Sequence, residues 1–164
     1  MNINHKNDNK MKKLLIICLV LSVSISSLYS QNKIIKGRVI DNNLEILPYV
    51  PIMVNDTVEV GRTDFNGFFQ IDIPISVEKI LLRSVGLEST IIKLIDKCDE
   101  VEVVMMLSGS YDFMTLKKVD RLRMKRFKKL PELHEEAFEK GILKKDKACY
   151  EQDFIHYYKK QQQI

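Results

Sequence analysis

The sequence lacks the short motifs by which most enzymes are recognised. It contains no G-x-S-x-G nucleophile elbow and no glycine-rich phosphate loop, so neither serine hydrolysis nor nucleotide binding is indicated. Histidine is scarce, with three residues in a chain of 164. His134-Glu135 starts like the zinc-protease pattern H-E-x-x-H, but Phe138 stands where the second histidine is needed, and His156 lies on a different predicted element. We therefore predict no catalytic residue, no metal and no cofactor, with an unrecognised hydrolase as an alternative.

The sequence also lacks a hydrophobic run of the length that a membrane span requires. The run at residues 14–21 follows two lysines and gives way to a serine-rich stretch. A positive start, a short apolar stretch and small residues are typical of a secretory signal peptide, which we predict over residues 1–30. Cleavage near Ser30-Gln31 places the protein in the periplasm, or at the outer membrane and cell surface. The alternative is an anchor that stays uncleaved at the N-terminus.

A strong net charge is missing from the predicted mature chain. The whole chain carries +4, but residues 1–30 contribute +3 of it, so a nucleic-acid partner is not predicted. The remaining charge is unevenly divided, with −4 over residues 31–110 and +5 over residues 111–164. The simplest use of this asymmetry is internal, with the basic region docked on the acidic one. An external acidic partner is the alternative.

Cysteine is rare as well. Of three cysteines, Cys18 belongs to the predicted leader, which leaves Cys98 and Cys149 as an even pair in an exported protein. A disulfide between them would close a loop of 51 residues and stabilise the fold by about 4 kcal/mol on the chain-entropy model. Two separate buried thiols are the alternative.

Residues 33–108 show an alternation of apolar and polar side chains with a period of two. Turn residues separate these runs, which is typical of short strands in an antiparallel sandwich. Pro48 and Pro51 lack an N–H, so their strand is predicted to lie at a sheet edge or to contain a bulge. The predicted core positions are Ile35, Gly37, Val39, Val50, Ile52, Val54, Phe69, Ile71, Ile73, Val101, Val103 and Met105.

Over residues 111–164 the period becomes helical. Pro131 ends or restarts the first helix, a second helix covers 132–140 with Gly141 as its cap, and Asp146 could cap a third. The apolar face of the first helix is predicted from Phe113, Leu116, Val119, Phe127 and Leu130, and the third would carry Phe154, Tyr157 and Tyr158.

Cations occupy the opposite side of the first predicted helix. They could contact an anionic partner such as a membrane surface, and the alternative is a solvated face over packed apolar residues. No aromatic residues alternate with them as a nucleic-acid stacking platform requires. The candidate contacts are Lys117, Lys118, Arg121, Lys125, Lys128 and Lys129.

The stretch GRTDFNGFFQIDIP, residues 61–74, places Asp64, Asn66 and Gly67 in one acidic loop. Alignment with a calcium-binding EF-hand loop puts Arg62 and Ile73 where the first and last oxygen ligands are required, so a cation site is not predicted. Asn-Gly suits a tight turn and an aspartate can accept bonds from following N–H groups, which indicates a β-hairpin.

Three motifs together resemble the carboxypeptidase regulatory-like domain family: IKGRVID at 35–41, LPYVPIMV at 47–54 and GRTDFNGFFQI at 61–71. The spacing from Gly61 to the Thr-Asp pair is one residue shorter here than in the family. The resemblance covers residues 34–107 and implies a seven-stranded, transthyretin-like Greek-key sandwich. Members occur as non-catalytic modules attached to zinc carboxypeptidases and TonB-dependent receptors, or stand alone.

These observations predict three segments: a signal peptide at 1–30, a sandwich at 31–110 and a basic helical appendage at 111–164. The predicted function is that of a non-catalytic, exported binding or accessory module of the bacterial envelope, which contacts a protein or a glycan. A peripheral membrane protein that uses the basic helix 117–129 is the alternative.

Overall fold

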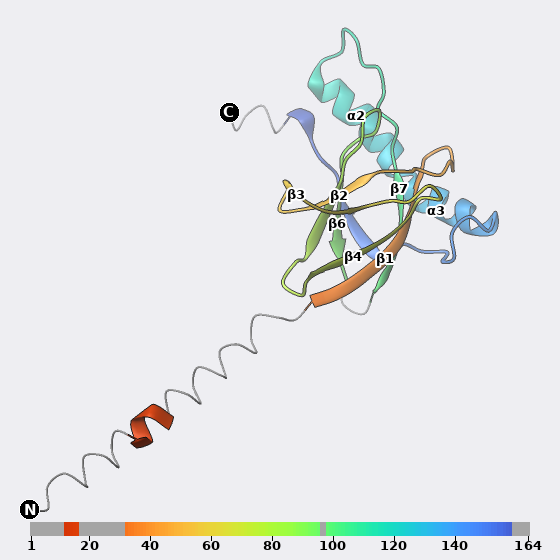
Figure 1. The fold of residues 1–164 in the computed structure, drawn as a ribbon. Helices are drawn as coiled ribbons and strands as arrows, with labels where there is room; N and C mark the ends of the chain where they lie inside the picture. Colours follow the sequence, from red (N-terminus) through yellow and green to blue (C-terminus); the bar gives the residue numbers. More distant parts are fainter. Residues whose placement is uncertain (1–11, 17–31, 96–97, 159–164) are drawn as a thin grey trace, which may run out of the picture. The chain divides into compact units, whose positions relative to one another are not determined.

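The computed structural model describes residues 12–16, 32–95 and 98–158 of the chain (Figure 1). The chain divides into two compact units, Met1–Asn32 and Lys33–Ile164, and the second contains both hydrophobic clusters. It therefore has the properties of an independent folding unit. Apart from a helical turn at 12–16, the predicted signal peptide and its cleavage site lie outside the described residues. Within the described ranges, no helix is long and apolar enough to cross a membrane.

Two β-sheets are the main secondary structure of the second unit, so the protein is mainly β with a helical C-terminal segment. The smaller sheet has three strands in the order β4-β1-β7, and the larger has five in the order β3-β2-β5-β6-β8. The strands are β1 (Asn32–Asp41), β2 (Pro51–Val54), β3 (Val58–Arg62), β4 (Phe68–Pro74), β5 (Lys79–Leu82), β6 (Thr90–Leu94), β7 (Glu100–Met105) and β8 (Tyr150–Asp153).

The expectation that all strands are antiparallel is wrong for one pair, because β1 and β7 run parallel. Their register aligns Lys36 with Glu100 and Asp41 with Met105. Parallel strands require a long connection, and here the intervening chain visits both sheets before it returns. A period of two is the same in both kinds of pairing, so the sequence pattern could not distinguish them.

The main hydrophobic core combines residues from the two sheets. On β4, for example, Phe69, Ile71 and Ile73 are buried while the residues between them are exposed, as the alternation predicts. The core positions predicted from β1, β2 and β7 are buried as well. Gly37 is one of these buried positions, and no larger residue fits there, because an added Cβ would collide with the carbonyl oxygen of Val101 and the ring of Phe69. The period of two therefore identified this core correctly.

The helices α2 (Leu116–Phe127) and α3 (Leu130–Glu139) follow the sheets. Strand β7 is buried on both faces, because its second face belongs to another cluster that includes residues of α3. The docking of the basic region on the acidic one is thus confirmed, and ion pairs such as Lys144–Glu100 connect the two. The second cluster contains Ile40, Val104, Met106, Leu130, Ala137 and Leu143.

The helix boundaries differ from the prediction at the start of α2. Thr115 is the N-cap and its side chain accepts a hydrogen bond from the Lys118 N–H. Phe113 therefore lies before the helix, where it is fully exposed with a φ of 58°, and its assignment to the apolar helix face is wrong. Helix α3 starts at Leu130 with a proline in its first turn, and Gly141 follows with a φ of 69° as its C-terminal turn requires.

The predicted third helix is also wrong, because its first part is strand β8. This strand pairs antiparallel with β6, with Leu94 opposite Tyr150 and Ile91 opposite Asp153. Its neighbour Cys149 forms a disulfide with Cys98, with the two Cα atoms 5.9 Å apart. The strand YEQD has no apolar alternation, so only its position at the edge of the sheet gives it β structure.

Two loop predictions need correction. Strand β2 lies between β3 and β5, so Pro48 and Pro51 do not mark a sheet edge, but the predicted bulge is present as a register shift between Ile52 and Met53. The loop after β3 is no hairpin, because β3 and β4 belong to different sheets. It turns a corner between the sheets.

The corner is held by hydrogen bonds between residues close together in the sequence. The Asp64 Oδ1 atom accepts hydrogen bonds from the N–H groups of Asn66 and Phe68, each 2.8 Å long. Gly67 has a φ of 75°, and an added Cβ would lie 2.8 Å from the Val39 carbonyl oxygen. The Asp64 side chain therefore stabilises the backbone of this turn.

A buried ion-pair network joins α2 to the larger sheet. The Arg123 side chain is 2% exposed, and its guanidinium lies 2.8 Å from Glu88, just ahead of β6. It also donates to Asp120 and to the Ile155 carbonyl oxygen, and it covers the Tyr157 ring at 3.6 Å. Helix, sheet and C-terminal segment thus meet at one side chain.

We predict that Arg123→Met lowers the free energy of unfolding by about 3–5 kcal/mol, because Glu88 would stay buried without its main partner. The double variant Arg123→Met with Glu88→Leu should recover much of this loss, since both buried charges are then removed. Urea denaturation followed by circular dichroism measures both. A loss below about 1 kcal/mol in the single variant, which is typical of exposed pairs, would contradict the buried network.

Replacement of both Cys98 and Cys149 by serine should lower the free energy of unfolding by about 4 kcal/mol through loop entropy. The same denaturation experiment tests this change, with and without a reductant. The reductant should destabilise the unmodified protein and leave the double-serine variant unaffected. Equal stability of the two proteins under oxidising conditions would show that the bond contributes nothing.

Candidate functional site

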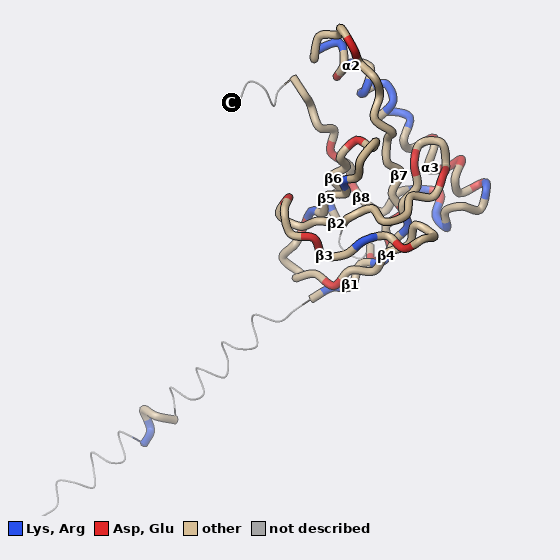
Figure 2. Tube along the Cα trace, turned by 45° about the horizontal axis from the view of Figure 1, so that its top comes forward, with Lys and Arg blue, Asp and Glu red and all other residues tan. Residues whose placement is uncertain are grey.

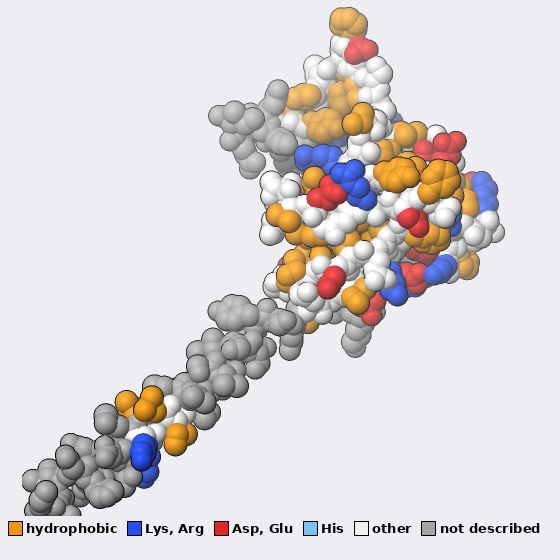
Figure 3. All heavy atoms as spheres, viewed as in Figure 1, with side chains coloured by type: hydrophobic (Ala, Val, Ile, Leu, Met, Phe, Trp, Pro, Cys, Tyr) orange, Lys and Arg blue, Asp and Glu red, His pale blue; other side chains and the backbone are white. Residues whose placement is uncertain are grey.

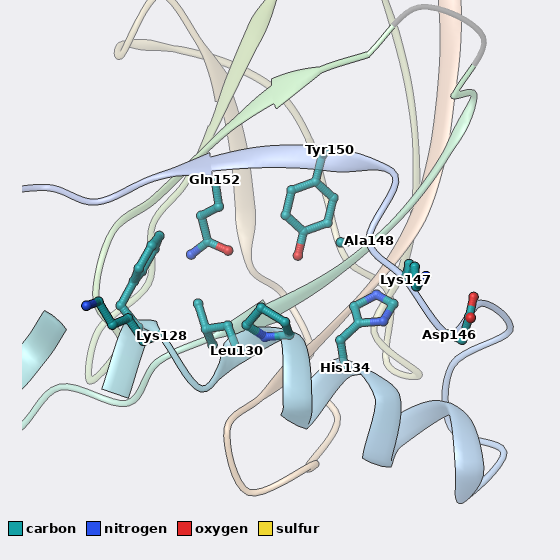
Figure 4. A pocket seen from close by; sticks show the side chains of 10 residues that line it. Lys128, Leu130, His134, Asp146, Lys147, Ala148, Tyr150 and Gln152 are labelled. Atoms are coloured by element: carbon teal, nitrogen blue, oxygen red, sulfur yellow. The ribbon is translucent and has the colours of Figure 1, made fainter. Parts of the chain in front are cut away.

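A cavity of about 530 Å³ opens between the two helices and the edge of the larger sheet. Cavities of this size commonly hold small molecules or a large side chain. In Figure 4, the side chains of α3 and those of β8 reach toward the same space from opposite sides. The wall consists of Phe127, Lys128, Leu130, Pro131, His134, Asp146, Lys147, Ala148, Tyr150 and Gln152.

Local sequence rules place these residues. Leu130 and His134 are four positions apart on α3, so they share one helix face. Tyr150 and Gln152 are two positions apart on β8 and share one strand face. The alternate residues Glu151 and Asp153 face away and pair with Lys93 on the adjacent strand β6 and with Lys79 on β5, the next strand of the sheet. The disulfide at Cys149 then fixes the start of β8 beside the helices.

His134 is the most enclosed polar residue of the wall, at 2% exposure. Its Nε2 atom lies 3.1 Å from the Glu102 carbonyl oxygen. A carbonyl only accepts hydrogen bonds, so Nε2 carries the proton in this contact. The Nδ1 atom is buried and has no hydrogen-bond partner among the described residues. An unpaired buried polar atom costs about 1–3 kcal/mol, and because Nδ1 has no exposed surface it is not a contact for a ligand in the cavity.

Tyr150 contributes a hydroxyl that stays neutral. Burial raises the pKa of Tyr150 well above its ordinary value of 10, against an opposing effect of the Val104 backbone. Besides the charged residues at its edge, the polar groups of the wall are the His134 ring, the Tyr150 hydroxyl and the Gln152 amide. Hydroxyl and amide groups orient a ligand through hydrogen bonds.

The rim of the cavity is charged. Lys128, Asp146 and Lys147 are exposed at its edge. Within the part of the chain that the structure describes, none of the three forms an ion pair, and the cations outnumber the single acid. A ligand with an apolar body and an anionic end matches this distribution.

The residues singled out from the sequence are distributed over separate regions. Of the basic candidates, Lys128 lies on the cavity rim, whereas Lys117, Lys118, Arg121, Lys125 and Lys129 are exposed and do not line it. Asp64, Asn66 and Gly67 form the corner between the sheets. Cys98 and Cys149 are joined in the disulfide.

The cavity residues on β8 were not predicted from the sequence. The sequence pattern predicts a helix for this segment, and a helix would place Tyr150 and Gln152 on different faces. The one available signal was the strict alternation of Tyr150 and Gln152 with two acids.

Among the described residues, no group of three or more His, Cys, Asp or Glu side chains is arranged to hold a metal ion.

Comparison with known proteins adds no relative. A scan against protein-family models matches none of them to this chain, and a search of curated proteins finds no match.

We predict that the buried Tyr150 hydroxyl makes the fold less stable at alkaline pH. The folded chain keeps Tyr150 protonated, while the unfolded chain ionises it near pH 10. The contribution of Tyr150 to stability is therefore complete below pH 10 and falls by about 1.4 kcal/mol for each further pH unit until the raised pKa is reached. Tyr150→Phe should remove this dependence, as measured by urea denaturation at several alkaline pH values. Tyr49→Phe, at an exposed tyrosine, is the matched control and should leave the dependence unchanged.

Proposed function

We propose that this chain is an exported, non-catalytic binding module of the bacterial envelope, and that the cavity between α3 and β8 takes an apolar group of a protein partner. The observation that carries the proposal is the cavity itself, whose lining includes the apolar residues Phe127, Leu130, Pro131 and Ala148. Apolar surface of this extent favours an apolar group over a glycan, because sugar hydroxyls would lose their hydrogen bonds to water there.

Further support for a binding role comes from the wall chemistry. The amide of Gln152 can hydrogen-bond to a partner backbone or side chain. The cations at the rim suit a partner segment that carries a carboxylate next to its apolar side chain. Each of these features contributes to holding a partner segment, and none of them requires a chemical step.

We also propose that residues 32–105 form a transthyretin-like sandwich of the carboxypeptidase regulatory-like family. Seven strands, β1 to β7, lie among the described residues of this range, which supports the proposal. The motif from Gly61 to Gly67 forms the corner between the sheets, a place where a short loop has little freedom to vary. Strand β8 and the helices come from outside the range of the resemblance, and the cavity lies where they meet the sheet.

A fluorescence assay tests the cavity with residues 32–164, from which the leader is removed. The probe is 1-anilinonaphthalene-8-sulfonate, which has an apolar body and one anionic group. Ala148→Trp places a large side chain in the cavity from an exposed backbone position, and we expect probe affinity to fall at least about tenfold. Ser108→Trp, on an exposed loop outside the cavity, is the matched control and should bind the probe as the unmodified protein does.

The partner itself is tested by photocrosslinking in the native envelope. A benzophenone side chain at position 148 should capture a defined protein, and capture should be competed by an excess of the unmodified mature protein but not of the Ala148→Trp variant. Capture of the same species from position 108, or competition by both proteins alike, would refute the cavity as the binding site. Attachment to a glycan in place of a protein would refute the proposed class of partner.

A further inference from the structure

We propose that the loop before α2 and the exposed face of α2 form a docking site for an anionic phospholipid surface, in which Phe113 enters the lipid and the cations of the helix contact the headgroups. This site is separate from the cavity between α3 and β8. It is carried by the exposure of Phe113, by its strained backbone, and by the distribution of cations on the neighbouring helix.

The first observation is the exposure of Phe113. Its side chain is 109% exposed, and the adjacent Met114 is 38% exposed. In Figure 1 the loop before α2 projects away from the sheets, and Figure 3 shows a hydrophobic side chain at the tip of this projection. An aromatic side chain at the tip of a projecting loop contributes nothing to the core, but it can enter a lipid interface.

The second observation is that the loop is held in this conformation. Phe113 has a φ of 58°, in a region that side chains other than glycine and asparagine rarely adopt. Arg126 fixes the base of the loop, because its guanidinium donates to the Tyr111 hydroxyl and to the Leu107 carbonyl oxygen. The Met114 N–H donates to the Tyr111 carbonyl oxygen across the turn. A strained backbone at an exposed aromatic residue destabilises the fold, so its presence is not explained by stability alone.

The third observation is the stripe of cations that follows the loop. Lys117, Lys118, Arg121 and Lys125 fall within an arc of about 100° at 3.6 residues per turn, and all four are exposed. Figure 2 shows these cations along α2, whereas acids are prominent on α3. Over the described ranges none of the four has a carboxylate partner. The two inward cations of the helix, Arg123 and Arg126, are the ones engaged by the fold.

Together these features fit a membrane better than a soluble polyanion. A polyanion would gain from the cations but not from Phe113, whereas a lipid surface uses both. Asp112 is also exposed in the loop, where its side chain accepts a hydrogen bond from the Ser110 hydroxyl. Its charge opposes binding to an anionic surface, so Asp112→Asn should strengthen the interaction.

The test uses residues 32–164 and vesicles made of equal parts of phosphatidylethanolamine and phosphatidylglycerol, with phosphatidylcholine vesicles as the neutral comparison. The protein contains no tryptophan, so Phe113→Trp introduces a single reporter. We expect its emission to shift to shorter wavelength and to be quenched by brominated lipid only with the anionic vesicles. Phe65→Trp, at another exposed aromatic on the corner between the sheets, is the matched control and should remain unquenched.

Flotation with the same vesicles measures each contribution. Phe113→Asn introduces a residue that tolerates the positive φ, so the stability of the fold should be retained or raised. Partitioning of the protein onto the anionic vesicles should fall about tenfold, because the aromatic ring is lost. Replacement of Lys117, Lys118, Arg121 and Lys125 by glutamine should reduce partitioning by at least about a hundredfold, at roughly fivefold per charge. Partitioning that depends on the cations but not on Phe113, or heparin binding without any shift of the Phe113→Trp emission, would overturn the proposal in favour of a soluble polyanion. Equal binding of all variants would overturn it entirely.

Discussion

The buried guanidinium of Arg123 is the constraint on which the C-terminal half of the structure depends. A charge removed from water must be paired, and the partners of Arg123 are Glu88 at the larger sheet and Asp120 on its own helix. Burial opposes the charge of Asp120, but the N–H groups of Tyr157 and Tyr158 together with Arg123 outweigh it and lower the pKa of Asp120. One network therefore fixes the rotation of α2 and the path of the chain after β8.

Once that rotation is fixed, the two proposed sites follow from it. The helix turns Arg123 and Arg126 inward, so its other four cations face the solvent. Arg126 in turn holds the loop that presents Phe113. At the other end of α2 the chain turns at Lys128 and Lys129 into α3, and this turn builds one wall of the cavity. The other wall is β8, which is kept at the sheet edge by pairing with β6 and by the disulfide.

The appendage predicted at 111–164 is therefore part of the folded unit, because it completes one sheet and covers the other. This arrangement explains why β7 is buried on both faces and why Glu102, between two buried valines, is buried too. The Glu102 carboxylate accepts from the N–H groups of Lys144 and Lys145, and its carbonyl oxygen accepts from His134. These bonds satisfy polar groups that an uncovered strand would leave to water.

The sequence by itself determined the inward faces of β1, β2, β4 and β7 and the presence of two helices after the strands. Period and turn residues are local properties, and the alternation of Phe69, Ile71 and Ile73 needs no partner to be read. Only the tertiary structure decided the parallel pairing of β1 with β7, the strand character of YEQD, and the exposure of Phe113. Each of these depends on residues far apart in the chain: an open sheet edge recruits β8, and a distant glutamate determines which arginine of α2 turns inward. The cavity lies in this second category, because it is assembled from contacts across the chain that no local pattern encodes. The cations of α2 were predicted from the helical period, and only the exposure of Phe113 beside them required the tertiary structure.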